Sequence, residues 1–385
     1  MPDNKLNICM TSNYFFPIVG GAEEQARLLA REIINLGHQV TYITAKYPNL
    51  KKYEEIHGVR VYRLPIWPWK KYLKRFIAKP LYLINLLLFL FRNGKRYSLF
   101  HSHGVFSIYS SFAIAVYGYM FNKPTVIKFA SKNDHQRVEN AFLGNFLFGL
   151  TKKFATVFVG NSPTLLSVME KSGIEVNKIE YIPNGVQIPE MKDKKLIRRN
   201  LNLPLDKKVV TCVSNFNPGK NQINLIRSWP LVLDNYPDAF LILLGNGERF
   251  EACSNLALDL GIKDSILFKG CVKNVYDYLM ASDLFTFPSN FPEGMSNALL
   301  EAMSVGLPIA ASNIPQNKIL IKHERNGLLF DPEDIHQISM TVIRLMRDTK
   351  YSQTLGRKAK KKVEKNFSIS AITERYLKLY KKILK

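Results

Sequence analysis

Short apolar runs alternate with longer stretches in which apolar residues recur at helical spacing. Residues 22–36 form one such helical stretch, which follows an apolar run and closes at Gly37. The apolar runs of the first half have the length of strands, at residues 6–10, 39–44, 59–64, 98–101, 124–129, 156–159 and 179–182. Strands that alternate with helices predict βα units and a parallel sheet covered on both faces.

The alternation stops near the middle of the chain and then begins again. Pro183-Asn184-Gly185-Val186 breaks the pattern, and residues 190–208 are polar and charged, which predicts a linker with a short helix. The second series of strands is predicted at residues 209–214, 240–244, 266–268, 284–288 and 308–311. A chain of 385 residues has room for two domains of ordinary size.

The predicted fold class is therefore α/β, with two doubly wound Rossmann-like domains that face a cleft. We expect an N-terminal domain over residues 1–187 and a C-terminal domain over residues 205–366. Residues 369–385 predict a final amphipathic helix, which we expect to pack back on the first domain.

The segment from Phe291 to Pro308 is the most informative part of the chain. Ser296 or Asn297 can cap a helix that Gly306 ends, so that Glu293 lies in the loop before this helix and Glu301 about one turn inside it. The first-turn N–H groups form an anion site between two carboxylates that can accept hydrogen bonds from hydroxyls. A nucleotide-sugar fits this layout, although an ordinary surface helix with acidic residues is an equal alternative.

In each domain, a glycine-containing loop follows the first predicted strand. In the second domain, Gly219 and Lys220 can bring an ammonium group to a phosphate oxygen, and a solvated loop lysine is the alternative. In the first domain, Gly20 and Gly21 let the backbone approach a ligand, or form a plain turn. The spacing is not GxGxxG, which disfavours NAD. Gly245-Asn246-Gly247 predicts a turn after its strand.

Metal and disulfide chemistry find little support in the sequence. His101 and His103 lie two apart on a predicted strand and could share a metal, but no third ligand suggests itself. The four cysteines form no CxxC pair, which argues against a zinc site or a disulfide framework and favours a reducing cytoplasm. We therefore expect no metal and no cofactor.

The net charge of +23 indicates an anionic partner. Residues 69–96 hold eight Lys or Arg and no acid, and aromatic residues are interleaved with them before the apolar run at 81–91. This combination favours an interfacial helix on an anionic membrane surface, and a core helix with basic flanks is the alternative. The apolar run is too short to span a bilayer, and the start of the chain does not resemble a signal peptide. No nucleic-acid-binding signature accompanies the charge, so nucleic acid is not an expected partner.

Taken together, these motifs resemble family 4 of the retaining GT-B glycosyltransferases, which includes sucrose and glycogen synthases, mannosyltransferases and bacterial polysaccharide glycosyltransferases. The resemblance covers nearly the whole chain. Its most specific feature is the Glu-x7-Glu spacing of Glu293 and Glu301 within Pro-Glu-Gly and Leu-Leu-Glu-Ala-Met. Supporting matches are Gly20-Gly21, Asn161-Ser162, Pro183 to Val186, Lys220 and Gly270 to Val272.

The resemblance implies roles for these residues. Glu301 would hold the ribose of the nucleotide, and Glu293 would contact the donor sugar. Lys220 and the amides of Gly294, Met295, Ser296 and Asn297 would hold the diphosphate. Gly270 to Val272 would border the base, and Gly20 and Gly21 would face the donor from the other domain. Glu293 and Lys220 are the catalytic candidates of a metal-independent, front-side displacement with retention.

The chain departs from the family pattern at two places. Asn215 stands where members usually carry an Arg, and its loop remains a donor-binding candidate. Lys128 and Ala130 fall where members often carry a His. The candidates to serve instead on the acceptor side are His103, Lys128, Ser131 and Asp134.

The resulting hypothesis is a transferase of hexose or N-acetylhexosamine. The donor would be UDP- or GDP-linked, and the acceptor a lipid-linked or growing saccharide in the synthesis of a cell-surface polysaccharide such as lipopolysaccharide or capsule. The enzyme would be cytoplasmic and peripheral on the inner face of the cell membrane. The alternatives are a sugar-nucleotide epimerase of the same fold and a charge-driven binding protein for anionic polymers. The sequence specifies neither the donor sugar, the acceptor, the linkage nor the oligomeric state.

Overall fold

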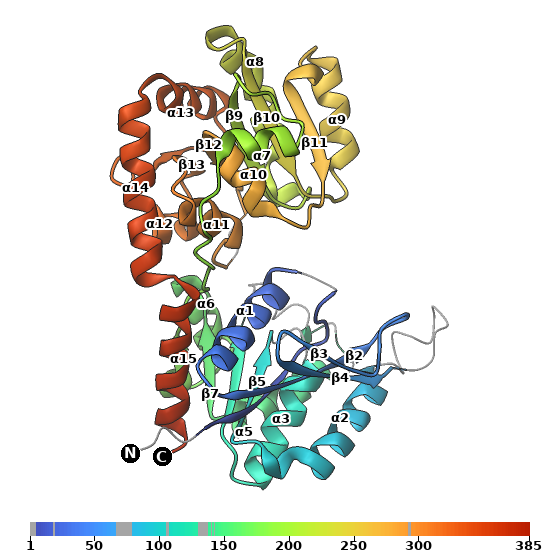
Figure 1. Ribbon diagram of the computed structural model, residues 1–385. Coiled ribbons are helices and arrows are strands. Elements are labelled where there is room, and N and C mark those ends of the chain that lie inside the picture. Colours follow the sequence, from blue (N-terminus) through green and yellow to red (C-terminus); the bar gives the residue numbers. More distant parts are fainter. Residues whose placement is uncertain are drawn as a thin grey trace. The chain divides into compact units, whose positions relative to one another are not determined.

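The computed structural model describes residues 5–17, 20–66, 79–104, 108–129, 138–139, 141, 143–291 and 294–385. The chain divides into two compact units (Figure 1). The first comprises residues 1–185 and 369–385, and the second residues 186–368. Each unit is built around its own, mainly parallel sheet, which confirms the predicted α/β class with two Rossmann-like sheets.

The sheet of the first unit has eight strands in the order β3-β4-β2-β1-β5-β6-β7-β8. Their bounds are β1 (Asn7–Thr11), β2 (Gln39–Lys46), β3 (Tyr53–Ile56), β4 (Val59–Pro65), β5 (Leu99–His103), β6 (Thr125–Phe129), β7 (Val157–Gly160) and β8 (Ile179–Tyr181). All neighbours pair in parallel except β3, which lies antiparallel to β4 at the sheet edge. The apolar pattern does not predict β3, because this edge strand, Tyr-Glu-Glu-Ile, carries two charges and no apolar run.

Helices cover both faces of the first sheet (Figure 1). Side chains of β5 alternate between them: Phe100 packs toward α2, α3 and α5, whereas Leu99 packs toward α1 and α15. The C-terminal helix α15 thus belongs to the core of the first unit. The helix bounds are α1 (Gly21–Asn35), α2 (Lys79–Asn93), α3 (Ile108–Met120), α5 (Gly144–Phe154), α6 (Pro163–Lys171) and α15 (Ile369–Ile383).

The sheet of the second unit has six parallel strands in the order β11-β10-β9-β12-β13-β14. Their bounds are β9 (Lys208–Val213), β10 (Ala239–Leu244), β11 (Ile266–Gly270), β12 (Leu284–Phe287), β13 (Ile309–Ser312) and β14 (Leu328–Phe330). One face packs against α8, α9 and α13, and the other against α7, α10, α11 and α14. These helices, together with α12, span α7 (Lys194–Asn200), α8 (Gln222–Asn235), α9 (Phe250–Asp259), α10 (Val275–Ala281), α11 (Asn297–Ser304), α12 (Pro315–Leu320), α13 (Ile335–Arg347) and α14 (Thr349–Asn366).

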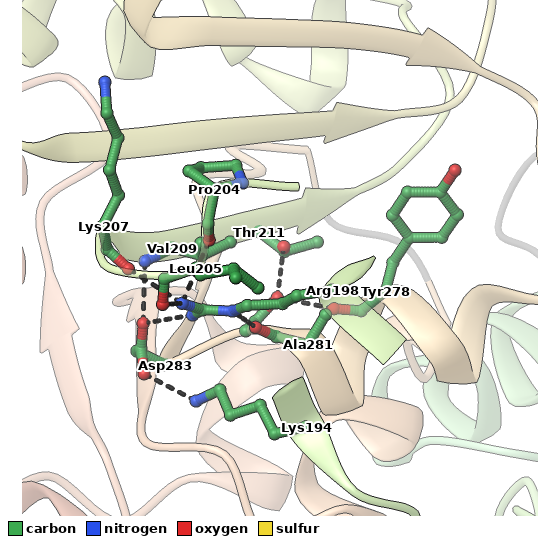
Figure 2. Close-up of polar contacts among 11 residues, drawn as sticks. Lys194, Arg198, Pro204, Leu205, Lys207, Val209, Thr211, Tyr278, Ala281 and Asp283 are labelled. Atoms are coloured by element: carbon green, nitrogen blue, oxygen red, sulfur yellow. Dashed lines mark hydrogen bonds and ion pairs between the residues drawn. The ribbon is translucent and has the colours of Figure 1, made fainter. Parts of the chain in front are cut away.

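A buried arginine, Arg198, links the short helix α7 to the sheet of the second unit (Figure 2). Arg198 pairs with Asp283 at 2.8 Å, and the same carboxylate oxygen accepts a hydrogen bond from the Val209 amide at 2.8 Å. Lys194 binds the other oxygen of Asp283 at 2.6 Å. The guanidinium also donates to the carbonyls of Ala281, Pro204, Leu205 and Lys207. The polar segment that carries α7 is therefore fixed to the second sheet by this arginine.

Candidate functional site

The order of strands in the second sheet reverses between β9 and β12. The chain proceeds from β9 to β10 on one side, and returns to place β12 on the other side of β9. Open α/β sheets bind ligands at such a switch point, beyond the carboxyl ends of the strands. The loop after β9 carries Lys220, and the loop after β12 leads into α11. Topology alone therefore places these two predicted segments at one edge.

Hydrogen bonds join these two loops directly. The carbonyl oxygen of Gly219 accepts from the Ser289 hydroxyl at 2.9 Å and from the amides of Asn290 and Phe291, both at 3.2 Å. A Cβ atom on Gly219 would lie 2.5 Å from the Cβ of Phe291. A side chain at position 219 would therefore collide with the Phe291 side chain. This is a different reason for glycine from the close approach to a ligand that the sequence suggested.

Lys220 ends a short 3-10 turn, Pro218–Lys220, on this edge. Its ammonium lies 5.5 Å from the centroid of the Phe287 ring, and the side chain is half-buried. The next residue, Asn221, has a left-handed backbone with φ of 53° and donates a hydrogen bond to the Pro332 carbonyl at 2.7 Å. The turn is thus fixed on both sides, which holds the lysine at the end of β9.

Ser296 caps α11, which decides between the two candidates that the sequence left open. Its hydroxyl accepts a hydrogen bond from the Leu299 amide at 3.3 Å. Met295 is buried before the helix, Asn297 begins it, and Glu301 is half-buried within it. Buried Gly294 precedes Met295, whereas Glu293 lies outside the described residues. The capped first turn therefore lies directly after the loop that Gly219 binds.

A glycine turn after β10 supports the loop that contains Asn215. Gly245 has φ of 129°, and a Cβ on it would lie 2.1 Å from the Ser214 carbonyl oxygen. The Phe216 amide donates to the Asn246 carbonyl at 3.0 Å. Asn215 itself is exposed. The sequence predicts Gly245-Asn246-Gly247 only as an ordinary turn, because its contact with the loop after β9 forms only in the folded sheet.

The predicted base-side residues follow β11, on the far side of β10. Gly270 ends β11 with φ of 72°, and its carbonyl accepts from the Gly245 amide at 2.8 Å. Val272 is partly buried against the core of the second unit. The loops after β9, β10, β11 and β12 thus share the carboxyl edge of one sheet, although no described contact joins Gly270 directly to Lys220.

The first sheet has an equivalent switch point between β1 and β5. Gly20 is the N-cap of α1 and Gly21 its first residue, whereas His103 is the last residue of β5. The Glu24 amide donates to the Gly20 carbonyl at 3.0 Å, so the helix begins at this pair. Gly20, Gly21 and His103 therefore flank the switch point of the first unit.

His101, His103 and Lys128 form a buried cluster beneath α15. The two imidazole rings stack with centroids 4.1 Å apart, and the Lys128 ammonium lies 5.7 Å from the centroid of the Tyr376 ring. Burial lowers the pKa of Lys128 to about 8. Burial also holds the pKa of both histidines well below the ordinary value, and Lys128 lowers them further. At pH 7 the two histidines are therefore neutral, whereas Lys128 still carries most of its positive charge.

Three further residues that the sequence singled out cannot be placed. Ala130, Ser131 and Asp134 lie outside the described residues. Among the residues that the structure does describe, no group of three or more His, Cys, Asp or Glu side chains is arranged to hold a metal ion.

The topology of both units and the site at the second switch point define a GT-B fold. Comparison with known proteins agrees with this class. A model described as "Glycosyl transferases group 1" matches residues 193–362, and one described as "Glycosyltransferase Family 4" matches residues 19–188. The chain belongs to this family of retaining GT-B glycosyltransferases.

Individual relatives are distant. The chain is 29% identical to the Escherichia coli UDP-Gal:alpha-D-GlcNAc-diphosphoundecaprenol alpha-1,3-galactosyltransferase, over 60% of this chain and 63% of that enzyme. It is 25% identical to an uncharacterized glycosyltransferase of Methanocaldococcus jannaschii, over 94% and 95% of the two chains. The crystal structure of Anabaena HepE in complex with UDP-glucose aligns with a TM-score of 0.80 at 18% identity, over 98% of this chain and all of that one (100%). At this identity, the structural match establishes the fold alone.

Proposed function

We propose that this protein transfers a hexose or N-acetylhexosamine, with retention, from a UDP- or GDP-sugar to a lipid-linked or saccharide acceptor in the synthesis of a cell-surface polysaccharide. The observation that carries the proposal is the bonded pair of loops at the second switch point. There the Gly219 carbonyl ties the Lys220 turn to the loop that enters α11. A cation and a helix N-terminus at one sheet edge are groups that can bind a diphosphate, and this supports the proposal.

In this proposal the diphosphate is the leaving group. Lys220 and the amides of residues 294–297 would bind its oxygens, where negative charge grows as the bond from the sugar C1 to the phosphate oxygen breaks. The acceptor oxygen would form its new bond to C1 on the same face and lose its proton to the departing phosphate. Glu301 would bind the ribose and Glu293 the donor sugar. No metal is needed for this step, because Lys220 and backbone dipoles supply the positive charge.

A membrane-bound acceptor is supported by the exposed face of α2. Ile84, Leu88 and Phe91 recur at helical spacing and are each about half exposed, at 53%, 48% and 50%. The opposite face, with Tyr82, Leu86 and Leu90, packs into the core of the first unit. Arg92, in the last turn of this helix, and Lys95, in the 3-10 turn that follows it, are both exposed. The helix therefore combines a core-packed face with an apolar and basic outer face, which suits an anionic interface.

We propose accordingly that the enzyme binds the inner face of the cell membrane from the cytoplasm. The basic and aromatic residues of 67–78 precede α2 in the sequence and lie outside the described residues. Among the described helices, none is both long and apolar enough to cross a bilayer. The relative from Escherichia coli acts, by its name, on a diphosphoundecaprenol-linked sugar, which is a precedent for a lipid-linked acceptor.

A donor screen with membrane extract tests the proposed activity. The purified full-length chain is incubated with single UDP- and GDP-sugars, and products are analysed by mass spectrometry. We expect addition of one sugar to a lipid or saccharide from one donor, and loss of that product in Glu301→Gln but not in the exposed control Glu364→Gln. An epimerase would convert the donor without a mass change and without acceptor. A polymer-binding protein would leave every donor intact.

A further inference from the structure

The cluster of Lys128, His101 and His103 contains several buried polar atoms without a hydrogen-bond partner in the described part of the chain. Both ring nitrogens of His103 and Nε2 of His101 are buried and make no hydrogen bond to any residue that the structure describes. The hydroxyl of Tyr376, whose ring contacts both His101 and Lys128 from helix α15, also has no partner among the described residues. Buried polar groups are nearly always hydrogen-bonded, so this many exceptions in one place require an explanation.

Lys128 adds a buried positive charge to these unpartnered polar groups. Its side chain is buried, and within the described part of the chain its ammonium contacts the Tyr376 ring but no carboxylate. A buried charge is costly unless a counter-charge accompanies it. The cluster therefore contains one cation and several possible N–H and O–H donors, and none of its described members is an acid.

The cluster lies at an edge of the first sheet where a ligand could bind. His103 is the last residue of β5, and Lys128 pairs with it in the sheet register one residue before the end of β6. Both therefore lie at the carboxyl edge of the sheet, and β5 borders the switch point of the first unit. Ligands of open α/β sheets bind at this edge.

We propose that Lys128 and His103 bind an anionic group of the acceptor, a phosphate or a carboxylate. This inference rests on the proposed function, in which the first unit binds the acceptor. The anion would accept hydrogen bonds from the ammonium and from an imidazole N–H, and would supply a counter-charge that no described residue of the cluster provides. An acidic acceptor follows, either a lipid-linked diphosphate or an acidic sugar.

Isothermal titration calorimetry on the full-length chain carrying Lys220→Met tests this site without anion binding at Lys220. The probes are inorganic pyrophosphate, glucuronate and, as an uncharged control, glucose. We expect one of the anions to bind and glucose not to bind. Adding Lys128→Met should weaken anion binding at least tenfold, whereas adding Lys123→Met, which removes the same charge near the opposite end of β6, should leave it unchanged. A preference for pyrophosphate would indicate a lipid-linked diphosphate, and a preference for glucuronate an acidic sugar.

Anion affinity measured over a range of pH tests the proposal even if Lys128→Met does not fold. Burial raises the pKa of Tyr376 and Tyr380 beyond this range and lowers those of both histidines, so within the cluster Lys128 alone changes charge between pH 7 and about 9.5. Anion affinity should therefore fall as the pH rises across this interval. An affinity that does not change with pH, or the absence of any anion binding, would overturn the proposal. UDP binding to the unmodified chain is a separate measurement, so the anion site and the donor site can fail independently.

Discussion

Individual residues differ in how much of their role the sequence reveals. Capping is local, so Ser296 was one of two candidates from the pattern alone. Gly219 was singled out for a ligand, but its contact with Phe291 depends on a segment far away in the sequence. The contribution of Gly245 has the same origin, because only the folded sheet brings its turn against Ser214. Tertiary contacts of this kind cannot be deduced from the local pattern.

Gly219→Ala should damage the donor site through this contact. The new Cβ would lie 2.5 Å from the Phe291 Cβ, so one of the two loops must move. We expect a loss of stability of about 1–3 kcal/mol, as for other overpacked positions, and weaker UDP binding. Denaturant unfolding and calorimetry measure the two effects. The control is Gly149→Ala, where a Cβ meets nothing within 4 Å, and an equal effect at both positions would refute this explanation.

The Arg198–Asp283 pair should contribute to stability in a pH-dependent way. Burial tends to raise the pKa of Asp283, but Lys194, the Val209 amide and Arg198 together outweigh it and lower the pKa. Because the folded pKa is below the unfolded one, this stabilisation is present above pH 4 or so and is lost as the pH falls through the folded pKa. Asp283→Asn should therefore lower stability at pH 7 and flatten its decline in acid.

Arg198→Met tests the same network from the other side. It leaves Asp283 with one fewer cation and several carbonyls without a donor, so we expect a loss of about 2–4 kcal/mol at pH 7. The neighbouring exposed Arg199→Met should change stability by less than about 0.5 kcal/mol. Urea unfolding of both variants measures the difference, and similar losses would show that the network has no special role.

At the scale of elements, periodicity predicted those with a clear apolar pattern. The helices α1 and α15 were found in this way, and so were the parallel strands of both sheets except β14, which has only three residues. β3 was not predicted because it is short and charged. α3 was not predicted because it is apolar nearly all round and has no polar face that would reveal its helical period. The apolar run within α2 left two alternatives open, and the structure gives this helix both a buried face and an exposed apolar face.

The exposed face of α2 should bind anionic membranes. Replacing Ile84 and Leu88 together by Ser removes two apolar side chains that the core does not use, so we expect several-fold weaker co-sedimentation with phosphatidylglycerol vesicles and unchanged stability. Leu258→Ser, at an exposed leucine of α9, is the control. Equal binding of the double variant and the unmodified chain would exclude α2 as the membrane contact.

At the scale of the whole molecule, strand order is what gives the local motifs their meaning. The sequence predicted two series of βα units, and from them the fold class, but it could not show that the loops after β9 and β12 are bonded to each other. That contact follows from the reversal of strand order between these strands. The role of Glu293, which lies outside the described residues, and the choice of donor sugar remain predictions.

UDP and GDP titrations of the unmodified chain, Lys220→Met and the exposed control Lys263→Met test the central claim most directly. If the switch point of the second unit holds the nucleotide diphosphate, one of the two nucleotides should bind to the unmodified chain. Its affinity should fall at least tenfold in Lys220→Met and stay unchanged in Lys263→Met, because only Lys220 lies on the turn bonded to the loop before α11. Full affinity in Lys220→Met, or no binding of either nucleotide to the unmodified chain, would contradict the account.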